Sequence, residues 1–138
     1  MNHLLLVKEL VQAYQAFERY SEAHIKTMGL TTTQFDIVAT LGNQPPMTCK
    51  ELGEKTLVSK GTMTGVLERL EAKGLIEKLM NDEDGRSYKI GLSKSGDKLF
   101  KKVFPEHVDY LGKAFGRLSK KELEQAVTVL QNVKAIFN

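Results

Sequence analysis

Hydroxyl and cationic side chains gather at two places in the chain, where they are suited to hydrogen bonding with phosphates and base edges. The first set lies at the start of an expected helix and comprises Ser59, Lys60, Gly61, Thr62 and Thr64. The backbone N–H groups of a helix N-terminus attract phosphate, and a lysine can also donate to guanine. The second place is Arg86, in a polar turn between two expected strands. Both sets predict contacts with double-stranded DNA.

The helix that carries the first set has two distinct faces. Met63, Val66, Leu67 and Leu70 recur at the spacing of one helical face, which predicts that they point into a core. The opposite face then carries small or polar residues, namely Gly61, Thr64, Gly65 and Glu68. A glycine costs about 1 kcal/mol relative to alanine inside a helix. Close approach to DNA is one explanation for the two glycines, and neutral drift is the other.

The elements around this helix have the order of a winged helix-turn-helix. A short amphipathic run, 48–56, is joined by Leu57 and Val58 to the second helix, 59–73, which Gly74 closes. Two strands, 76–80 and 87–92, follow, and the turn between them, 81–85, is rich in residues that tolerate a tight backbone. Two short helices followed by a hairpin predict a DNA-reading module.

The residues of the hairpin have a specific arrangement, in which D-x-R is followed by strand residues and then by L-S-x-x-G. It comprises Asp84, Arg86, Leu92, Ser93 and Gly96. With the helix before it, this arrangement resembles the MarR (multiple-antibiotic-resistance regulator) family of bacterial transcription factors, over essentially the whole chain. The resemblance implies a mainly α fold with a small β-hairpin wing. It also implies that Arg86 reaches the minor groove or its phosphates and that Asp84 orients the wing.

The wing and the overall charge depart from a strongly DNA-attracting pattern. Gly85 stands where the family often has a second basic residue, and Asn81, Asp82 and Glu83 make the tip acidic. The formal net charge of the chain is +3, yet basic and acidic residues are equal in number between Thr48 and Leu92. Bulk attraction to phosphate should therefore be modest, and a few well-placed groups should carry more of the binding.

The length of 138 residues predicts one domain. Residues 30–96 would form the winged helix-turn-helix, and 1–28 and 97–138 would form dimerisation helices. The first helix is expected over 4–27, a second over 31–41, and a helix from Ser93 to about Leu118 that Pro105 bends. Ser119 and Glu122 form a capping box for a last helix over 120–137.

Both terminal helices carry more apolar surface than one neighbour can cover, which predicts a homodimer. The residues expected at its interface are Leu6, Leu10, Leu123, Val127, Leu130, Val133 and Phe137. The alternative is that both helices fold back on the same chain. In the related family the terminal helices entwine as a two-fold dimer, which favours the homodimer.

Other chemistries have little support in the sequence. No phosphate loop, nucleophile elbow or carboxylate pair indicates an enzyme, and no cofactor is expected. The histidines are isolated in the sequence, so no metal site is expected. Because some members of the family sense zinc, a role for His107 as a zinc ligand stays open as an alternative. The single cysteine, Cys49, is either a small packed residue or an oxidisable thiol beside Lys50. No apolar run reaches the roughly 18 residues that span a bilayer, so we expect a cytoplasmic protein.

The sequence therefore supports two hypotheses. The first is a ligand-responsive repressor that binds a pseudo-palindromic operator as a homodimer. Family members bind small aromatic effectors, and the aromatic residues that could line such a pocket here are Tyr14, Phe17, Phe35 and Tyr110. The second hypothesis is a winged-helix module that binds protein without reading DNA, which the neutral module and the acidic wing motivate.

Overall fold

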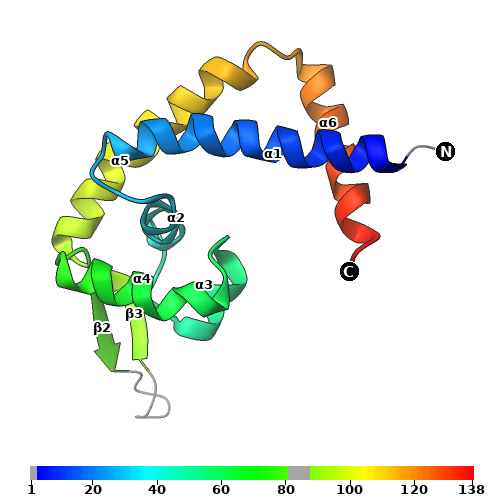
Figure 1. The fold of residues 1–138 in the computed structure, drawn as a ribbon. Helices are drawn as coiled ribbons and strands as arrows, with labels where there is room; N and C mark the ends of the chain where they lie inside the picture. The colour runs from blue at the N-terminus through cyan, green and yellow to red at the C-terminus, as the bar shows by residue number, and fades with distance from the viewer. Residues whose placement is uncertain (1–2, 81–87) are drawn as a thin grey trace. The chain divides into compact units, whose positions relative to one another are not determined.

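The computed structural model describes residues 3–80 and 88–138, which form six helices and three strands. The helices are α1 (His3–Lys26), α2 (Thr32–Leu41), α3 (Cys49–Lys55), α4 (Lys60–Ala72), α5 (Lys94–Phe115) and α6 (Lys120–Ala135), and the strands are β1 (Met47–Thr48), β2 (Ile76–Met80) and β3 (Tyr88–Leu92). The chain divides into two compact units, Met1–Pro105 and Glu106–Asn138. The prediction of a mainly helical chain with a small sheet is confirmed (Figure 1).

The junction between α1 and α2 is defined by a glycine and a threonine. Gly29 adopts a left-handed conformation (φ 75°), which a residue with a side chain rarely adopts. Thr31 is the N-cap of α2, because its hydroxyl accepts from the Gln34 N–H at 3.2 Å and the Gln34 side chain accepts from the Thr31 N–H at 3.1 Å. This reciprocal capping starts the second helix at Thr32, within the expected range 31–41.

The sheet has three antiparallel strands in the order β1-β3-β2. Strands β2 and β3 form the expected hairpin, with Ile76 opposite Leu92 and Met80 opposite Tyr88. The additional strand β1 pairs Met47 with Ile90. Strand β1 was not predicted from the sequence, because a strand of two residues is too short to show alternation in the sequence.

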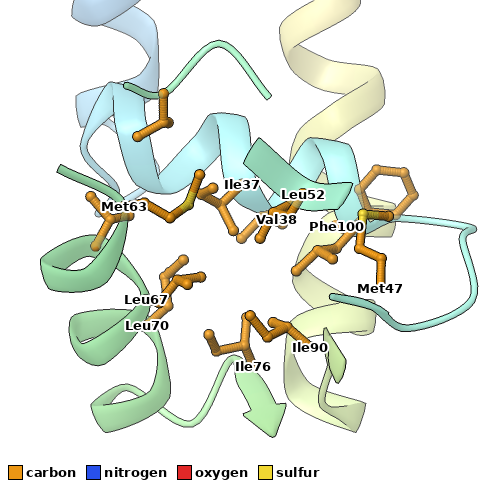
Figure 2. Packing of buried hydrophobic residues seen from close by; sticks show 13 residues of the cluster. Ile37, Val38, Met47, Leu52, Met63, Leu67, Leu70, Ile76, Ile90 and Phe100 are labelled. Carbon is orange, nitrogen blue, oxygen red and sulfur yellow. The ribbon is translucent and has the colours of Figure 1, made fainter. Parts of the chain in front are cut away.

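The first unit has its own hydrophobic core, shown in Figure 2. Leu52 of α3, Leu70 of α4 and Ile37 of α2 are fully buried together. Met47 and Ile90 bring in the sheet, and Phe100 closes the core from α5; the remaining members are Val38, Leu41, Val58, Met63, Val66, Leu67 and Ile76. Helices α2, α3 and α4 and the sheet thus bury one shared core, and this core fixes the position of α4.

The end of the hairpin is tied to the end of α4. The Ser93 hydroxyl donates to the Gly74 carbonyl at 2.6 Å and accepts from the Gly96 N–H at 3.0 Å, which caps α5. A Cβ atom at position 96 would overlap the Leu75 carbonyl oxygen, so this site accepts only glycine without a shift. The Ser93 and Gly96 arrangement that resembled the family therefore has a packing reason.

The second unit contains the end of α5 and all of α6. Helix α5 continues through Pro105 and ends at Phe115, earlier than the expected Leu118, because Gly116, Arg117 and Leu118 form single turns instead. The Ser119 and Glu122 capping box is confirmed, with the Ser119 hydroxyl accepting from the Glu122 N–H at 3.1 Å. Helix α6 ends at Ala135, shortly before the expected Phe137.

Candidate nucleic-acid interface

Helix α4 has the two faces that its sequence predicts. Met63, Val66, Leu67 and Leu70 are buried in the core. The residues predicted to contact DNA from this part of the chain are exposed, and they are Ser59, Lys60, Gly61, Thr62 and Thr64. The structure therefore brings this set together on the surface of one helix and at its N-terminus.

The N-terminus of α4 lacks the capping bond that a serine usually supplies. Ser59 is the N-cap residue, but its side chain accepts no hydrogen bond from the backbone of the first turn. Its hydroxyl lies 3.1 Å from the Thr62 hydroxyl, which in turn donates to the Ser59 carbonyl at 3.1 Å. Ser59 thus does not act as a side-chain cap, and its hydroxyl does not satisfy the free N–H groups at the positive end of α4.

The glycines of α4 are not required by packing within the chain. A Cβ atom placed at Gly61 or at Gly65 would meet no other atom within 4 Å. This removes internal crowding as their reason. Close approach of another molecule, or neutral drift, remains as the explanation.

The base of the wing adds side chains that the sequence interpretation did not single out. The Lys78 ammonium lies 5.9 Å from the centre of the Tyr88 ring and 3.8 Å from the Glu71 carboxylate. Lys78 and Tyr88 border a hollow of about 340 Å³ between α3, α4 and the sheet, which Thr64 and the exposed Cys49 also line. Cys49 is therefore not packed away as a small core residue. The pairing of Lys78 with Ile90 across the hairpin is what brings these groups beside α4.

The two predicted wing residues, Arg86 and Asp84, lie outside the described residues. Their roles in DNA contact and wing orientation remain predictions. Strand β3, which follows these residues, is positioned by its pairing with β2.

The residues predicted at a dimer interface lie on two surfaces rich in apolar side chains. Leu6 and Leu10 of α1 are exposed, as are Val127, Leu130 and Phe137 in or just after α6. Leu123 and Val133 are half-buried. Apolar exposure of this extent is typical of a surface that another molecule covers.

The four predicted effector residues belong to different parts of the chain. Tyr14 is exposed, Phe17 is also exposed, and Phe35 is half-buried in α2. Tyr110, in the second unit, stacks on the buried His107 with ring centres 6.0 Å apart. The Glu18 carboxylate accepts a hydrogen bond from the Tyr14 phenol and raises the pKa of Tyr14. Whether the four residues line one pocket stays a prediction.

Within residues 3–80 and 88–138, no group of three or more His, Cys, Asp or Glu side chains is arranged to hold a metal ion. Over the same residues, no helix is both long enough and apolar enough to cross a membrane.

The fold and the exposed face of α4 define a winged helix-turn-helix protein of the DNA-binding type. The sequence model of the MarR family matches residues 30–88, from the α1–α2 junction to the start of β3. Residues 30–88 therefore match the MarR family of transcriptional regulators, and the chain is similar to regulators of this type over most of its length.

Relatives and solved structures agree with this assignment over most of the chain. The homoprotocatechuate degradative operon repressor of Escherichia coli is 26% identical over 136 residues, which cover 99% of this chain and 92% of the relative. A putative MarR-like transcription regulator from Bacillus cereus has the same fold, with a TM-score of 0.86 at 22% identity and coverage of 100% and 99%. The structure of Bordetella bronchiseptica BpsR, described with the regulation of its DNA binding by 6-hydroxynicotinic acid, has a TM-score of 0.82, 26% identity and coverage of 91% and 89%. These relatives are regulators rather than enzymes.

Proposed function

We propose that this protein is a homodimeric regulator that inserts α4 into the major groove of a pseudo-palindromic operator and responds to a small aromatic effector in the cytoplasm. The main support for DNA binding is the exposed N-terminal face of α4. Hydroxyl groups, a lysine and two glycines lie there, and the helix end has no side-chain acceptor from Ser59. Such a surface suits phosphate and base edges rather than an apolar protein partner.

Within this surface we assign different roles to different residues. Ser59 and Thr62 lie at the helix N-terminus, where a phosphate would meet the backbone N–H groups of the first turn. Lys60 can donate to a guanine or to a phosphate. Thr64 is one turn further along the same face and suits contact with a base edge.

The wing supplies a contact that carries no sequence information. Arg86 would reach the minor groove or its phosphates, and Asp84 would orient the wing. Substitution of Arg86 by alanine should weaken binding to all sequences to a similar degree, and should lower the salt dependence of log Kd by about 1. Competition binding with operators altered one base pair at a time measures this. A loss confined to one base position would contradict a backbone role.

The exposed apolar side chains of α1 and α6 support the proposed homodimer. A second copy would cover Leu6, Leu10, Val127 and Leu130, and a two-fold pair would present two α4 helices to the same duplex. The half-sites would then lie one helical turn, about 34 Å, apart. An effector that prefers a dimer with a different spacing would release the DNA.

The proposed effector is a small aromatic molecule. BpsR, whose DNA binding is regulated by 6-hydroxynicotinic acid, shares the fold over most of this chain. Tyr14, Phe17, Phe35 and Tyr110 are the residues we propose to line the effector pocket. Their aromatic rings would stack on an aromatic ligand.

Binding of the purified protein to the DNA upstream of its own coding region tests the proposal directly. Fluorescence anisotropy at two salt concentrations, with an unrelated duplex of equal length as the control, should give a salt-sensitive complex that prefers the upstream DNA. The absence of any sequence preference at both salt concentrations would reject DNA readout and favour the protein-binding alternative. Addition of hydroxylated aromatic acids to the complex then tests the effector.

A further inference from the structure

The turn between α3 and α4 is held by a carboxylate that lies outside it. Asp36, on α2, accepts hydrogen bonds through its Oδ2 atom from the Thr56 hydroxyl and from the Leu57 backbone N–H, the latter at 2.7 Å. The Thr56 hydroxyl oxygen in turn accepts from the Val58 N–H at 3.3 Å. The amides of Leu57 and Val58 therefore depend on Asp36, either directly or through Thr56.

Packing alone does not determine the conformation of this turn. Leu57 is 92% exposed, so its side chain adds nothing to the core, while Val58 is buried. The Thr56 N–H closes α3 by donating to the Leu52 carbonyl at 2.9 Å. The path from the end of α3 to the start of α4 is thus set by Val58 and by the Asp36 network. Hydrogen bonds to an ionised carboxylate are roughly twice as strong as neutral ones, so this network is a firm constraint.

The direction of this turn decides how α4 leaves α3. The residues proposed to contact DNA begin at Ser59, immediately after Val58. Productive contacts require such groups to be held within about 0.5 Å and 10–20° of the right geometry. We propose that Asp36, acting through Thr56, is a positioning residue for DNA readout, because it fixes the angle at which α4 presents its exposed face. This inference rests on the proposed DNA-binding function.

The negative charge of Asp36 separates the positioning role from the alternative that Asp36 only repels phosphate. An acidic residue in a DNA-binding module repels phosphate, so an Asp36 without a positioning role should only weaken binding to every sequence. Its removal would then strengthen binding to all DNA. A positioning residue has the opposite effect on the operator, because its removal loosens the helix that reads the sequence.

The test compares Asp36→Ala, Thr56→Val, the double variant and Thr56→Ser. The measured quantity is the ratio of Kd for an unrelated duplex to Kd for the upstream operator at one salt concentration. We expect this ratio to fall about ten-fold in Asp36→Ala and by a similar factor in Thr56→Val, with no further fall in the double variant. Thr56→Ser keeps the hydroxyl and should restore the wild-type ratio.

Glu54→Ala is the matched control, because Glu54 is an exposed acid on the neighbouring α3 and its removal changes the net charge equally. It should tighten binding to both duplexes and leave the ratio unchanged. If Asp36→Ala behaves like Glu54→Ala, the inference is wrong. Additive effects of Asp36→Ala and Thr56→Val would also contradict it, since the two groups would then not act as one unit.

Amide hydrogen exchange provides a second measurement that needs no DNA. In Asp36→Ala the Leu57 amide should exchange at least about ten times faster, while the core amide of Leu70 keeps its rate. Unchanged exchange at Leu57 overturns the inference whatever the DNA result. If Asp36→Ala fails to fold, Thr56→Val, which removes a hydroxyl and keeps the shape, carries the same comparison at Val58.

The two levels of the proposal fail in distinguishable ways. A wild-type protein without sequence preference overturns the proposed function, and the readout role falls with it. A wild-type preference that survives in Asp36→Ala overturns the positioning role alone.

Discussion

The helix-turn-helix and the terminal helices solve the burial of apolar residues in opposite ways. In the helix-turn-helix, Ile37, Leu52 and Leu70 are fully buried within the chain itself. In α1 and α6, residues of the same chemical kind, such as Leu6 and Leu130, are about half exposed. The first region is a finished core that positions α4, whereas the second is a surface suited to a partner. The contrast shows that apolar periodicity alone does not tell whether a helix face is buried within its own chain or by another molecule.

The largest expected effect comes from damage to the finished core. Leu70→Ala should lower the free energy of unfolding by about 2–5 kcal/mol, because it removes a fully buried side chain and leaves a cavity. Urea unfolding followed by circular dichroism measures this. Leu79→Ala, at an exposed strand position, is the control and should cost far less. Equal losses in both variants would contradict the description of this region as a self-contained core.

The next effect concerns the exposed surface. Leu130→Asp should change the stability of an isolated subunit by no more than about 0.5 kcal/mol, as surface substitutions usually do. It should abolish association by placing a charge in the proposed dimer interface. Sedimentation velocity measures the change from dimer to monomer. Leu57→Asp introduces the same charge at an exposed position outside α1 and α6 and should leave the dimer intact. A wild-type protein that sediments as a monomer would remove the basis of the comparison.

A smaller effect separates stability from function within α4. Gly65→Ala should raise the free energy of unfolding by up to about 1 kcal/mol, because alanine favours helix and nothing lies within 4 Å of the added Cβ. The same substitution should weaken operator binding if the helix approaches DNA closely. Gly112→Ala in α5 has equally open surroundings and should stabilise without affecting DNA binding. Unchanged affinity in Gly65→Ala would assign the glycine to drift.

The smallest effect is a pH dependence at the start of α6. Hydrogen bonds from the Ser119 backbone and side chain lower the pKa of Glu122. A carboxylate with a lowered pKa in the folded state stabilises the fold above its ordinary pKa, and this contribution disappears as the pH falls through the lowered value. Glu122→Gln should therefore be less stable than wild type at neutral pH, and the difference should shrink on acidification. Urea unfolding at a series of pH values between neutral and strongly acidic measures it, and a difference independent of pH would exclude the ionised cap.

Much of the fold could be predicted from short-range patterns. The N-cap residue Ser119 and the strand 76–80 lie where the sequence predicted them. The division of α4 into buried and exposed faces was also predicted, because the spacing of Met63, Val66, Leu67 and Leu70 follows from helix geometry alone. The candidate DNA-contacting set on α4 follows from the same spacing.

Other features left no readable pattern in the sequence. Strand β1 consists of two residues, and only its partner Ile90 makes Met47 part of a sheet. The role of Asp36 depends on Thr56, which is 20 residues away in the sequence, and a single acid in a helix usually indicates a solvated surface. Lys78 and Tyr88 come together beside α4 only through the hairpin.

The sequence by itself determined where the helices begin, which face of α4 is apolar and that the chain resembles the MarR family. Those properties depend on residues within about one helical turn of each other, and neighbours along the chain stay neighbours in the fold. Only the tertiary structure decided that Asp36 holds the turn before α4 and that β1 completes the sheet. These contacts join residues distant along the chain, and burial of the shared core is what brings them together.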